Sequence, residues 1–356
     1  MGLIVLDTSL NMLSVFDTFE SLIWTERYSA YGDFEVYTNA NRSFLDTLKD
    51  DYYLWLKGSD QTMIVEGRKI ESDAENGHRF VVTGRSLESI LERRIVWKQT
   101  ILSGNFQNGI KKLLDENIIN PSDPARKVEG LIFEESTDPQ ITSLKIEAQF
   151  TGDILYDAIK KLCDSKHIGF RIKLSDDNKF IFKLYAGADR SYDQLSNPYV
   201  VFSPKFENII NTNYLESKKT LKTVTLVAGE GEGVDRKTIT VACSSGIGAG
   251  LNRRELYTDA RDISSTVDNR TLTDSEYNAQ LTQRGLENLA DNVSTKSFEG
   301  EVETTRMYRY GEDFFMGDIV QIVNEYGIEG KSRVTEFIRS QNKEGIVSYP
   351  TFINVE

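Results

Sequence analysis

The sequence predicts a multi-domain α+β protein in which β-structure dominates, and three observations support this fold class. The chain has 356 residues, whereas a single domain usually has about 100–200. Segments rich in Val, Ile, Tyr, Phe and Trp fill most of its beginning and its end, as strands do. Helical periodicity is concentrated between these two regions. With 39% hydrophobic residues, the chain can bury more than one core.

The beginning of the chain predicts an antiparallel sheet or barrel. Six segments combine β-branched or aromatic residues with short spacings between Gly, Asn and Asp. They are residues 3–7, 21–28, 33–38, 53–58, 62–72 and 78–86. Two short helical patterns, at residues 42–50 and 86–95, place apolar side chains on one face. We expect both helices to cover an end of a barrel.

From about residue 100 the pattern favours an inserted α+β module. Residues 107–118 and 151–170 carry apolar stripes at helical spacing, and Thr151 is the expected N-cap of the second helix. Residues 170–187 then alternate as two strands around the turn-forming run Asp176–Asn178. The sequence therefore predicts a helix followed by a hairpin.

Strands return near residue 200, and one more helix is clearly marked. The strand-like segments are residues 199–203, 222–229 and 236–243. Thr273 and Glu276 have the spacing of a capping box, which predicts that a helix begins there. Beyond residue 298 the sequence is again strand-like.

Charge, cysteines and apolar runs limit the setting in which the protein works. Acidic residues outnumber basic residues by 55 to 42, giving a net charge of −13, so binding to nucleic acid phosphates is not its expected role. Cys163 and Cys243 are far apart and predict no disulfide framework. The N-terminus lacks a basic region, and no apolar run approaches about 18 residues. We expect a soluble protein without membrane insertion.

The sequence contains no pattern that predicts catalysis, a metal site or a cofactor. His78 and His167 have no second histidine or cysteine at ligand spacing. The GIGAG run at residues 246–250 is not followed by a helical pattern, as a dinucleotide-binding loop would be. Adjacent acids, such as Asp50 and Asp51, are expected by chance in so acidic a chain. We therefore expect a structural or binding protein and not an enzyme.

Five blocks of sequence, in this order, resemble the tail hub proteins of siphophages, the family of tail-associated (Tal) N-terminal and Gp27-like baseplate hubs. The blocks are NMLSVFDTFESLIWTERYSAYGDFEVYT, VVTGRSLESILERRIVW, GADRSYDQLSNPYVVFSPKFENI, RRELYTDARDIS, and YRYGEDFFMGDIVQIVNEYGI followed by SRVTE. Together they extend over nearly the whole chain. No single block is as specific as a metal-binding motif, and the resemblance depends on their order.

The resemblance implies a Gp27-like architecture. Two barrel-like β domains would carry an inserted α+β module and peripheral helices. The implied boundaries are residues 1–100 with 201–260 for the first barrel, 101–200 for the inserted module, and 261–356 for a helix with the second barrel. Hubs of this family often have a C-terminal extension that degrades peptidoglycan or binds a receptor. Such an activity is expected on another protein or outside these residues.

The resemblance also implies a function. The chain would form a homotrimeric ring of pseudo-sixfold symmetry at the tail tip of the virion, after assembly in the cytoplasm of the bacterial host. The ring would close the tail tube and attach to the distal tail protein. The implied partners are further copies of the chain, the tape measure protein, and tail fibre or receptor-binding proteins, while DNA passes through without specific binding.

Eight residues are candidates for subunit contacts or for bracing the framework. They are Trp24, Arg27, Arg253, Arg254, Asp259, Asp262, Phe314 and Asp318. Phe314 and Phe315 are both expected to anchor the C-terminal β module, and the charged residues of the segment 253–262 can equally form ion pairs within the chain.

Two other functions remain open from the sequence. One is a cell-wall hydrolase with catalytic acids in residues 101–200. The other is a receptor-binding or carbohydrate-binding protein that uses some of its 16 tyrosines and 3 tryptophans as stacking platforms.

Overall fold

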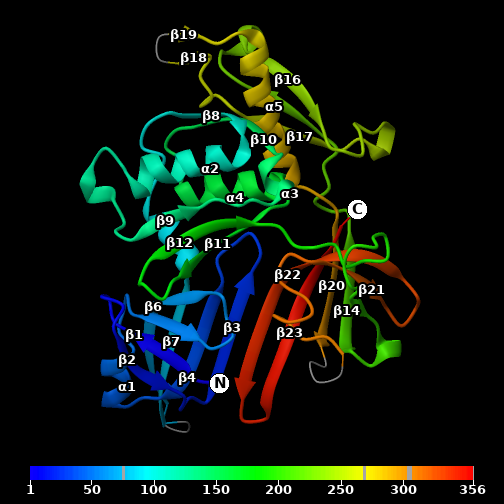
Figure 1. The fold of residues 1–356 in the computed structure, drawn as a ribbon. Helices are drawn as coiled ribbons and strands as arrows, with labels where there is room; N and C mark the ends of the chain where they lie inside the picture. The colour runs from blue at the N-terminus through cyan, green and yellow to red at the C-terminus, as the bar shows by residue number, and fades with distance from the viewer. Residues whose placement is uncertain (74–76, 268–269, 303–306, 356) are drawn as a thin grey trace. The chain divides into compact units, whose positions relative to one another are not determined.

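The computed structural model describes residues 1–73, 77–267, 270–302 and 307–355 (Figure 1). The chain divides into two compact units. The first unit contains Met1–Ser89, Phe170–Leu215 and Lys296–Glu356, and the second contains Ile90–Gly169 and Glu216–Thr295. The chain thus leaves the first unit and re-enters it twice.

A thirteen-stranded sheet forms most of the first unit. Its strands are β1 (Leu3–Leu6), β2 (Met12–Phe16), β3 (Ser21–Arg27), β4 (Asp33–Asn39), β5 (Tyr53–Leu56), β6 (Thr62–Asp73), β7 (Gly77–Ser86), β13 (Val201–Phe202), β14 (Ile209–Ser217), β20 (Thr295–Val302), β21 (Ile319–Val323), β22 (Glu329–Asn342) and β23 (Gly345–Asn354). The order is β14-β20-β23-β22-β3-β4-β7-β6-β5-β1-β2, and β21 joins through β22 and pairs with β13. β2 and β14 are therefore the two edges of this path.

The sheet curls around two hydrophobic cores. The first core collects inward-facing side chains of β1 to β7, and the second collects those of β13, β14 and β21 to β23. The two cores meet where β3 pairs with β22, in a register that places Arg27 opposite Glu336 and Trp24 opposite Arg339. Trp24 packs into the first core and Tyr28, just beyond β3, into the second. The mostly β, α+β fold class is confirmed, and the predicted division into two barrel-like β domains stays a prediction.

Shorter elements complete the first unit. The helix α1 (Arg42–Thr47) packs Phe44 and Leu45 against the first core, as predicted for a covering helix. The strands β11 (Gly169–Leu174) and β12 (Phe180–Tyr185) are paired, and Asn178 in their turn has a positive φ of 59°. The predicted hairpin is therefore present. The 3-10 turn η4 (Pro204–Phe206) lies between β13 and β14.

The second unit combines helices with small sheets. Its elements are η1 (Leu87–Arg93, which starts in the first unit), β8 (Thr100–Asn105), α2 (Phe106–Leu114), η2 (Asp115–Ile119), η3 (Pro124–Arg126), β9 (Leu131–Glu134), α3 (Pro139–Thr142), β10 (Lys145–Phe150), α4 (Leu155–Ser165), β15 (Val224–Ala228), η5 (Gly233–Asp235), β16 (Thr238–Ala242), η6 (Gly250–Asn252), β17 (Glu255–Asp259), β18 (Thr266–Val267), β19 (Arg270–Thr271) and α5 (Asp274–Ala290). β8 pairs with β10, and β15 lies between β16 and β17. The helix α5 packs against this second sheet.

The two predicted helix starts have different outcomes. α5 begins directly after Thr273, and the predicted capping box with Glu276 is present. The predicted N-cap Thr151 is wrong, because α4 starts at Leu155 with Ile154 in the capping position. The Thr151 hydroxyl instead donates to the carbonyl of Phe150.

The units group the chain differently from the boundaries that the resemblance implied. Residues 296–356 lie with the first ninety residues, because β22 pairs along β3. Residues 216–295, including α5, lie with residues 90–169. Sequence patterns identified many of these strands but not their partners, so this grouping had no local signal.

Candidate functional site

The described residues offer no site for metal chemistry. Among them, no group of three or more His, Cys, Asp or Glu side chains could hold a metal ion. The helices of the same residues include none that is long and apolar enough to cross a membrane. His78 lies on the surface, where its Nδ1 is 2.9 Å from the Ser72 hydroxyl.

The seam between β3 and β22 is braced by charges that are far apart in the sequence. The Arg27 guanidinium contacts Glu336 at 2.5 Å and also pairs with Asp33. One residue before it, Glu26 is only 3% exposed and pairs with Arg339. A buried carboxylate requires such compensation, since burial alone strongly disfavours its charge. The seam thus depends on contacts between residues about 310 positions apart.

Tyr310 adds a third group to the buried pair. Its hydroxyl donates to Glu26 at 3.2 Å, and its ring stacks on Phe337 with centroids 3.9 Å apart. Burial raises the pKa of Tyr310 well above its ordinary value, with the Glu26 charge as the second cause. Arg339 also lies over the rings of Tyr310 and Phe337. Sequence reasoning missed Glu26, Tyr310 and Arg339, because nothing local predicts which strands meet.

Trp24 is a core residue of the first half. Its side chain is fully buried, its indole N–H donates to the Ser59 hydroxyl at 3.1 Å, and its ring lies near that of Phe34. The buried indole is therefore satisfied by a polar partner. A structural contact with a neighbouring subunit at this residue stays a prediction.

Asp318 ties together the turn before β21 and the segment 188–190. Its carboxylate is almost fully buried and accepts from the Ala188 N–H at 2.7 Å, the Arg190 Nε at 2.7 Å and the Phe315 N–H at 3.0 Å. The Arg190 partner was not singled out from the sequence, since 128 positions separate the two residues. This carboxylate braces the framework of the second core.

The two phenylalanines before β21 differ. Phe314 is fully buried, with its ring centroid 5.3 Å from that of Phe202 and 5.6 Å from that of Tyr310. Phe315 is 45% exposed, so the expectation that both residues anchor the module is wrong for Phe315. The Asp318 contact to the Phe315 N–H turns the backbone here, and only one ring of the pair enters the core.

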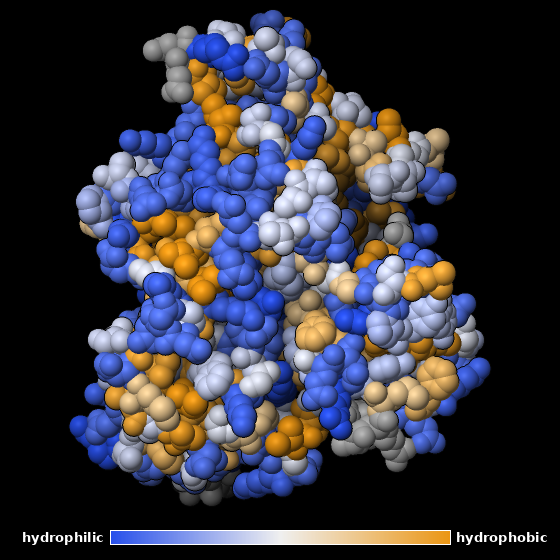
Figure 2. Space-filling model, in the orientation of Figure 1, coloured by the Kyte–Doolittle hydropathy of each residue, from blue (hydrophilic) through white to orange (hydrophobic). Residues whose placement is uncertain are grey.

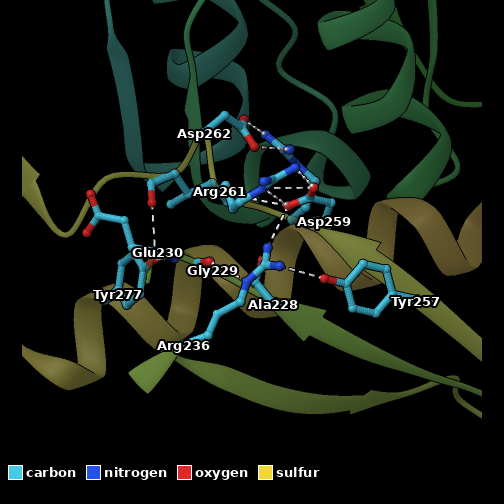
Figure 3. A network of polar contacts seen from close by, with 11 residues as sticks. Ala228, Gly229, Glu230, Arg236, Tyr257, Asp259, Arg261, Asp262 and Tyr277 are labelled. Carbon is cyan, nitrogen blue, oxygen red and sulfur yellow. Dashed lines mark hydrogen bonds and ion pairs between the residues drawn. The ribbon is translucent and has the colours of Figure 1, made fainter. Parts of the chain in front are cut away.

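The other four candidates lie in the second unit, and two of them, Asp259 and Asp262, belong to a network of arginines and carboxylates (Figure 3). Asp259 accepts from Arg236 at 2.7 Å and from Arg261 at 2.7 Å, and Asp262 pairs with Arg284 at 2.8 Å. Hydrogen bonds from Arg261 lower the pKa of Asp259 to about 2, with Arg236 contributing further. Neither Arg236 nor Arg284 has a sequence signal, because each lies more than twenty positions from its acid.

The same network fixes the chain between β17 and α5. Arg236 also donates to the carbonyls of Ala228 and Gly229 and to the Tyr257 hydroxyl (Figure 3). The Tyr277 hydroxyl accepts from the Glu230 N–H and donates to a backbone carbonyl in this segment, that of Ile263. These contacts join two strands, the segment before β16 and a helix, as a structural brace does.

Arg253 and Arg254 lie directly before β17. Arg253 forms an exposed ion pair with Glu255 at 2.6 Å. The Arg254 N–H donates to the Thr223 hydroxyl at 3.0 Å, and its guanidinium donates to the Lys218 carbonyl. The structure therefore gives all eight candidates contacts within the chain, and their role in subunit contacts stays a prediction.

We expect acid to weaken the second unit through Asp259. Its pKa is lowered to about 2 from 3.8, so its contribution to stability is complete above the unfolded value and is lost as pH falls toward the folded value. Thermal unfolding between about pH 4 and pH 2 should show a smaller fall in midpoint for Asp259→Asn than for the parent. The variant Glu255→Gln is a control expected to stay within about 0.5 kcal/mol of the parent at neutral pH. Equal acid slopes for Asp259→Asn and the parent would contradict this account.

Both edges of the large sheet expose apolar side chains. On β2 these are Met12, Leu13 and Val15, and on β14 they are Ile210, Tyr214 and Leu215. Figure 2 shows hydrophobic surface over the region where Figure 1 labels β1, β2 and α1. Unpaired edges with apolar side chains are sites where another chain can add, and proteins usually cover or charge them. These edges are candidate assembly surfaces.

The chain is thus a large β-rich protein with two cores, braced seams and apolar side chains on the open edges of its sheet. Residues 3–352 match the family model described as Siphovirus ReqiPepy6 Gp37-like protein. The chain therefore belongs to this family of siphovirus tail proteins. No curated protein matches the sequence significantly.

Solved structures of tail proteins share the fold. The 43 kDa tail protein of prophage MuSo2 from Shewanella oneidensis is 11% identical, with a TM-score of 0.59 over 99% of this chain and 98% of its own. The prophage tail protein gp18 of Listeria monocytogenes EGD-e is 13% identical, with a TM-score of 0.57 over 100% and 95%. A tail protein from Neisseria meningitidis MC58 is 12% identical, with a TM-score of 0.56 over 100% and 97%. The recognition of a phage tail protein from the sequence is confirmed.

Proposed function

We propose that this tail protein is the hub of the tail tip, where three copies form a ring that closes the distal end of the tail tube. The ring binds the distal tail protein on one side and forms part of the channel for DNA and the tape measure protein. Tail fibres or receptor-binding proteins attach around it. In this role the chain is a scaffold and not an enzyme.

The open edges of the sheet carry this proposal. β2 and β14 are the two ends of one strand path, and each exposes apolar side chains. Contacts that repeat from the edge of one copy to a different surface of the next are heterologous, and such contacts close into a ring when the rotation fits. Closure would cover both edges at once, which removes an aggregation hazard of the isolated chain.

The charge of the chain suits a channel. A net charge of −13 disfavours binding of DNA phosphates. Carboxylates that line the lumen would let DNA pass without adhesion. Retention of DNA by the assembled ring at low salt would argue against this part of the proposal.

Absolute mass in solution tests the ring. Light scattering coupled to size exclusion should give three times 40.4 kDa at assembly concentrations. Leu13→Glu places a charge on the β2 edge and should shift the protein to the monomer while leaving its circular dichroism unchanged. Ile23→Glu is the matched control, since Ile23 is 39% exposed on β3 and pairs with Ser340 on one side and Glu35 on the other.

A monomer at every concentration, alone and with the distal tail protein, would overturn the trimer. If Leu13→Glu forms trimers as stable as those of the parent, the ring is still supported, but the β2 edge is not part of its interface. Release of soluble fragments from purified peptidoglycan would contradict the scaffold role and favour a hydrolase. Retention on a glycan column would favour a carbohydrate-binding role.

A further inference from the structure

A buried carboxyl lies where the chain leaves the first unit and where it first returns. Glu88 follows the end of β7, one residue before the first segment of that unit ends at Ser89. Its Oε1 accepts from the N–H of Ile172, two residues after the unit resumes at Phe170, with an N···O distance of 2.7 Å. One side chain thus connects the exit and re-entry segments of the same unit.

A third segment joins the same carboxyl through Ser86. The Ser86 hydroxyl bonds to Glu88 Oε2 and accepts from the Gly32 N–H at 2.7 Å. The Ser86 N–H in turn donates to the Gly32 carbonyl at 2.9 Å. Glu88 and Ser86 have no exposed surface. The carboxyl therefore holds the end of β7, the turn between β3 and β4, and the strand β11 around one buried point.

The surroundings of Glu88 provide little compensation for a negative charge. Burial raises its pKa from 4.5 to about 7, although the bonds from Ser86 and Ile172 and the Arg171 charge act in the opposite direction. Among these causes the one cation is Arg171 on β11, whose charge lowers the pKa of Glu88. Tyr185 on β12 is the other titratable group that senses the Glu88 charge, and Glu26 on β3 acts on that same tyrosine. The Ser86 hydroxyl and the Ile172 N–H both donate to this carboxyl, and a neutral carboxyl keeps the bond from Ile172 at Oε1 while its proton shares the Oε2–Ser86 contact.

Arg171 has an unused donor beside this point. Its Nη1 contacts Asp60 at 2.6 Å and its guanidinium lies over the ring of Tyr185, at 4.3 Å from the centroid. Its Nε is buried and has no hydrogen-bond partner among the described residues. These contacts join Arg171 to other groups, and among the described residues the structure shows no ion pair between its guanidinium and Glu88.

We propose that Glu88 is a proton-operated latch of the first unit. With its proton, the carboxyl ties the exit segment, the re-entry segment and the β3–β4 turn together. Without the proton, the tie opens more readily, because opening lets water reach the carboxylate. The latch responds to pH without unfolding either core.

The direction of the response follows from proton linkage. The closed form holds the proton more tightly than the open form, so closure is favoured in acid and is lost as pH rises through about 7. Between about pH 5 and pH 6.5 the opening equilibrium should rise about tenfold per pH unit, since one pKa unit corresponds to one decade.

Amide hydrogen exchange at Ile172 and infrared spectroscopy test the latch in the full chain. After correction for intrinsic rates, protection of the Ile172 N–H should fall about tenfold per pH unit in that window. Glu88→Gln imitates the neutral carboxyl, so in this variant the protection of the Ile172 N–H should not change with pH. The infrared spectrum of the parent at about pH 6 should contain a protonated-carboxyl band that Glu88→Gln lacks, because a group with a pKa of about 7 is mostly protonated there.

Two further variants keep the test decisive. Ser86→Ala removes a hydrogen bond that lowers the pKa of Glu88, so the midpoint of its exchange profile should move to higher pH. Glu287→Gln removes a second buried carboxyl with a raised pKa, in the other unit, and should leave the Ile172 profile unchanged. Identical profiles for the parent and Glu88→Gln, or no difference in the carboxyl band, would overturn the proposal. If Glu88→Gln does not fold, an unshifted Ser86→Ala profile would overturn it equally.

Discussion

Replacing Arg339 by methionine is expected to lower the free energy of unfolding of the first unit by about 3–5 kcal/mol, the usual cost of leaving a buried charge without its partner. The Glu26 side chain is 4% exposed and that of Arg339 is 14% exposed. Methionine keeps much of the arginine stem's volume and removes the guanidinium that faces Glu26 and the Gly58 carbonyl. The loss of unfolding free energy is therefore due mainly to the unpaired charge of Glu26 and less to a cavity.

Urea unfolding followed by tryptophan fluorescence measures this effect. Two of the three tryptophans, Trp24 and Trp55, lie in the first unit, and Trp24 is fully buried there. The matched control is Arg253→Met, which removes an ion pair exposed on both sides and should cost about 0–1 kcal/mol. The double variant Glu26→Met with Arg339→Met should recover much of the loss, because it leaves no unpaired charge. A loss under about 1 kcal/mol for Arg339→Met would refute the brace.

The sequence predicted what depends on neighbours in the chain. The capping box of Thr273 and Glu276 needs only four consecutive residues, and it is present. The hairpin around Asn178 depends on one turn between two alternating segments, and it is present as well. Local propensity and turn chemistry act over a few residues, so a single sequence contains the whole signal.

The sequence did not predict what depends on strand pairing. β22 pairs with β3 across more than three hundred positions, and that pairing alone creates the contacts of Glu26 with Arg339 and of Arg27 with Glu336. Any acid of the chain has 42 possible Lys and Arg partners, so residue type does not identify the pair. The order of the five blocks gave the family, because that order integrates information over the whole chain.

The candidate residues show the same difference between features with a local signal in the sequence and features that depend on distant partners. Phe314 and Asp318 were chosen near a recognisable turn, and their burial follows from that turn. Asp259 and Asp262 were chosen only as charges in a polar segment, and their arginine partners come from the segment before β16 and from α5. Subunit contacts of all these residues depend on a second chain, about which the fold of one chain gives no direct information.

Replacing Phe314 by alanine is the other change with a large expected effect, about 3–5 kcal/mol on the first unit. The ring is fully buried and meets the rings of Phe202, Tyr310 and Phe337. Its loss removes both apolar contact and edge-to-face ring pairs, and the surrounding sheet cannot collapse to fill the space.

The adjacent residue supplies the control for this change, since Phe315→Ala removes the same number of atoms from a side chain that is 45% exposed. We expect it to cost under about 0.5 kcal/mol in the monomer, because surface substitutions rarely cost more. Urea unfolding of the two variants, at a concentration where the parent is monomeric, measures the difference in stability directly.

Light scattering at assembly concentration then separates the two roles of the turn, in core packing and in assembly. If Phe315→Ala weakens the trimer while sparing the monomer, the exposed ring belongs to an interface, and the same turn anchors the core through one phenylalanine and the assembly through the next. Equal losses of monomer stability from the two variants would show that the turn repacks and would remove this division.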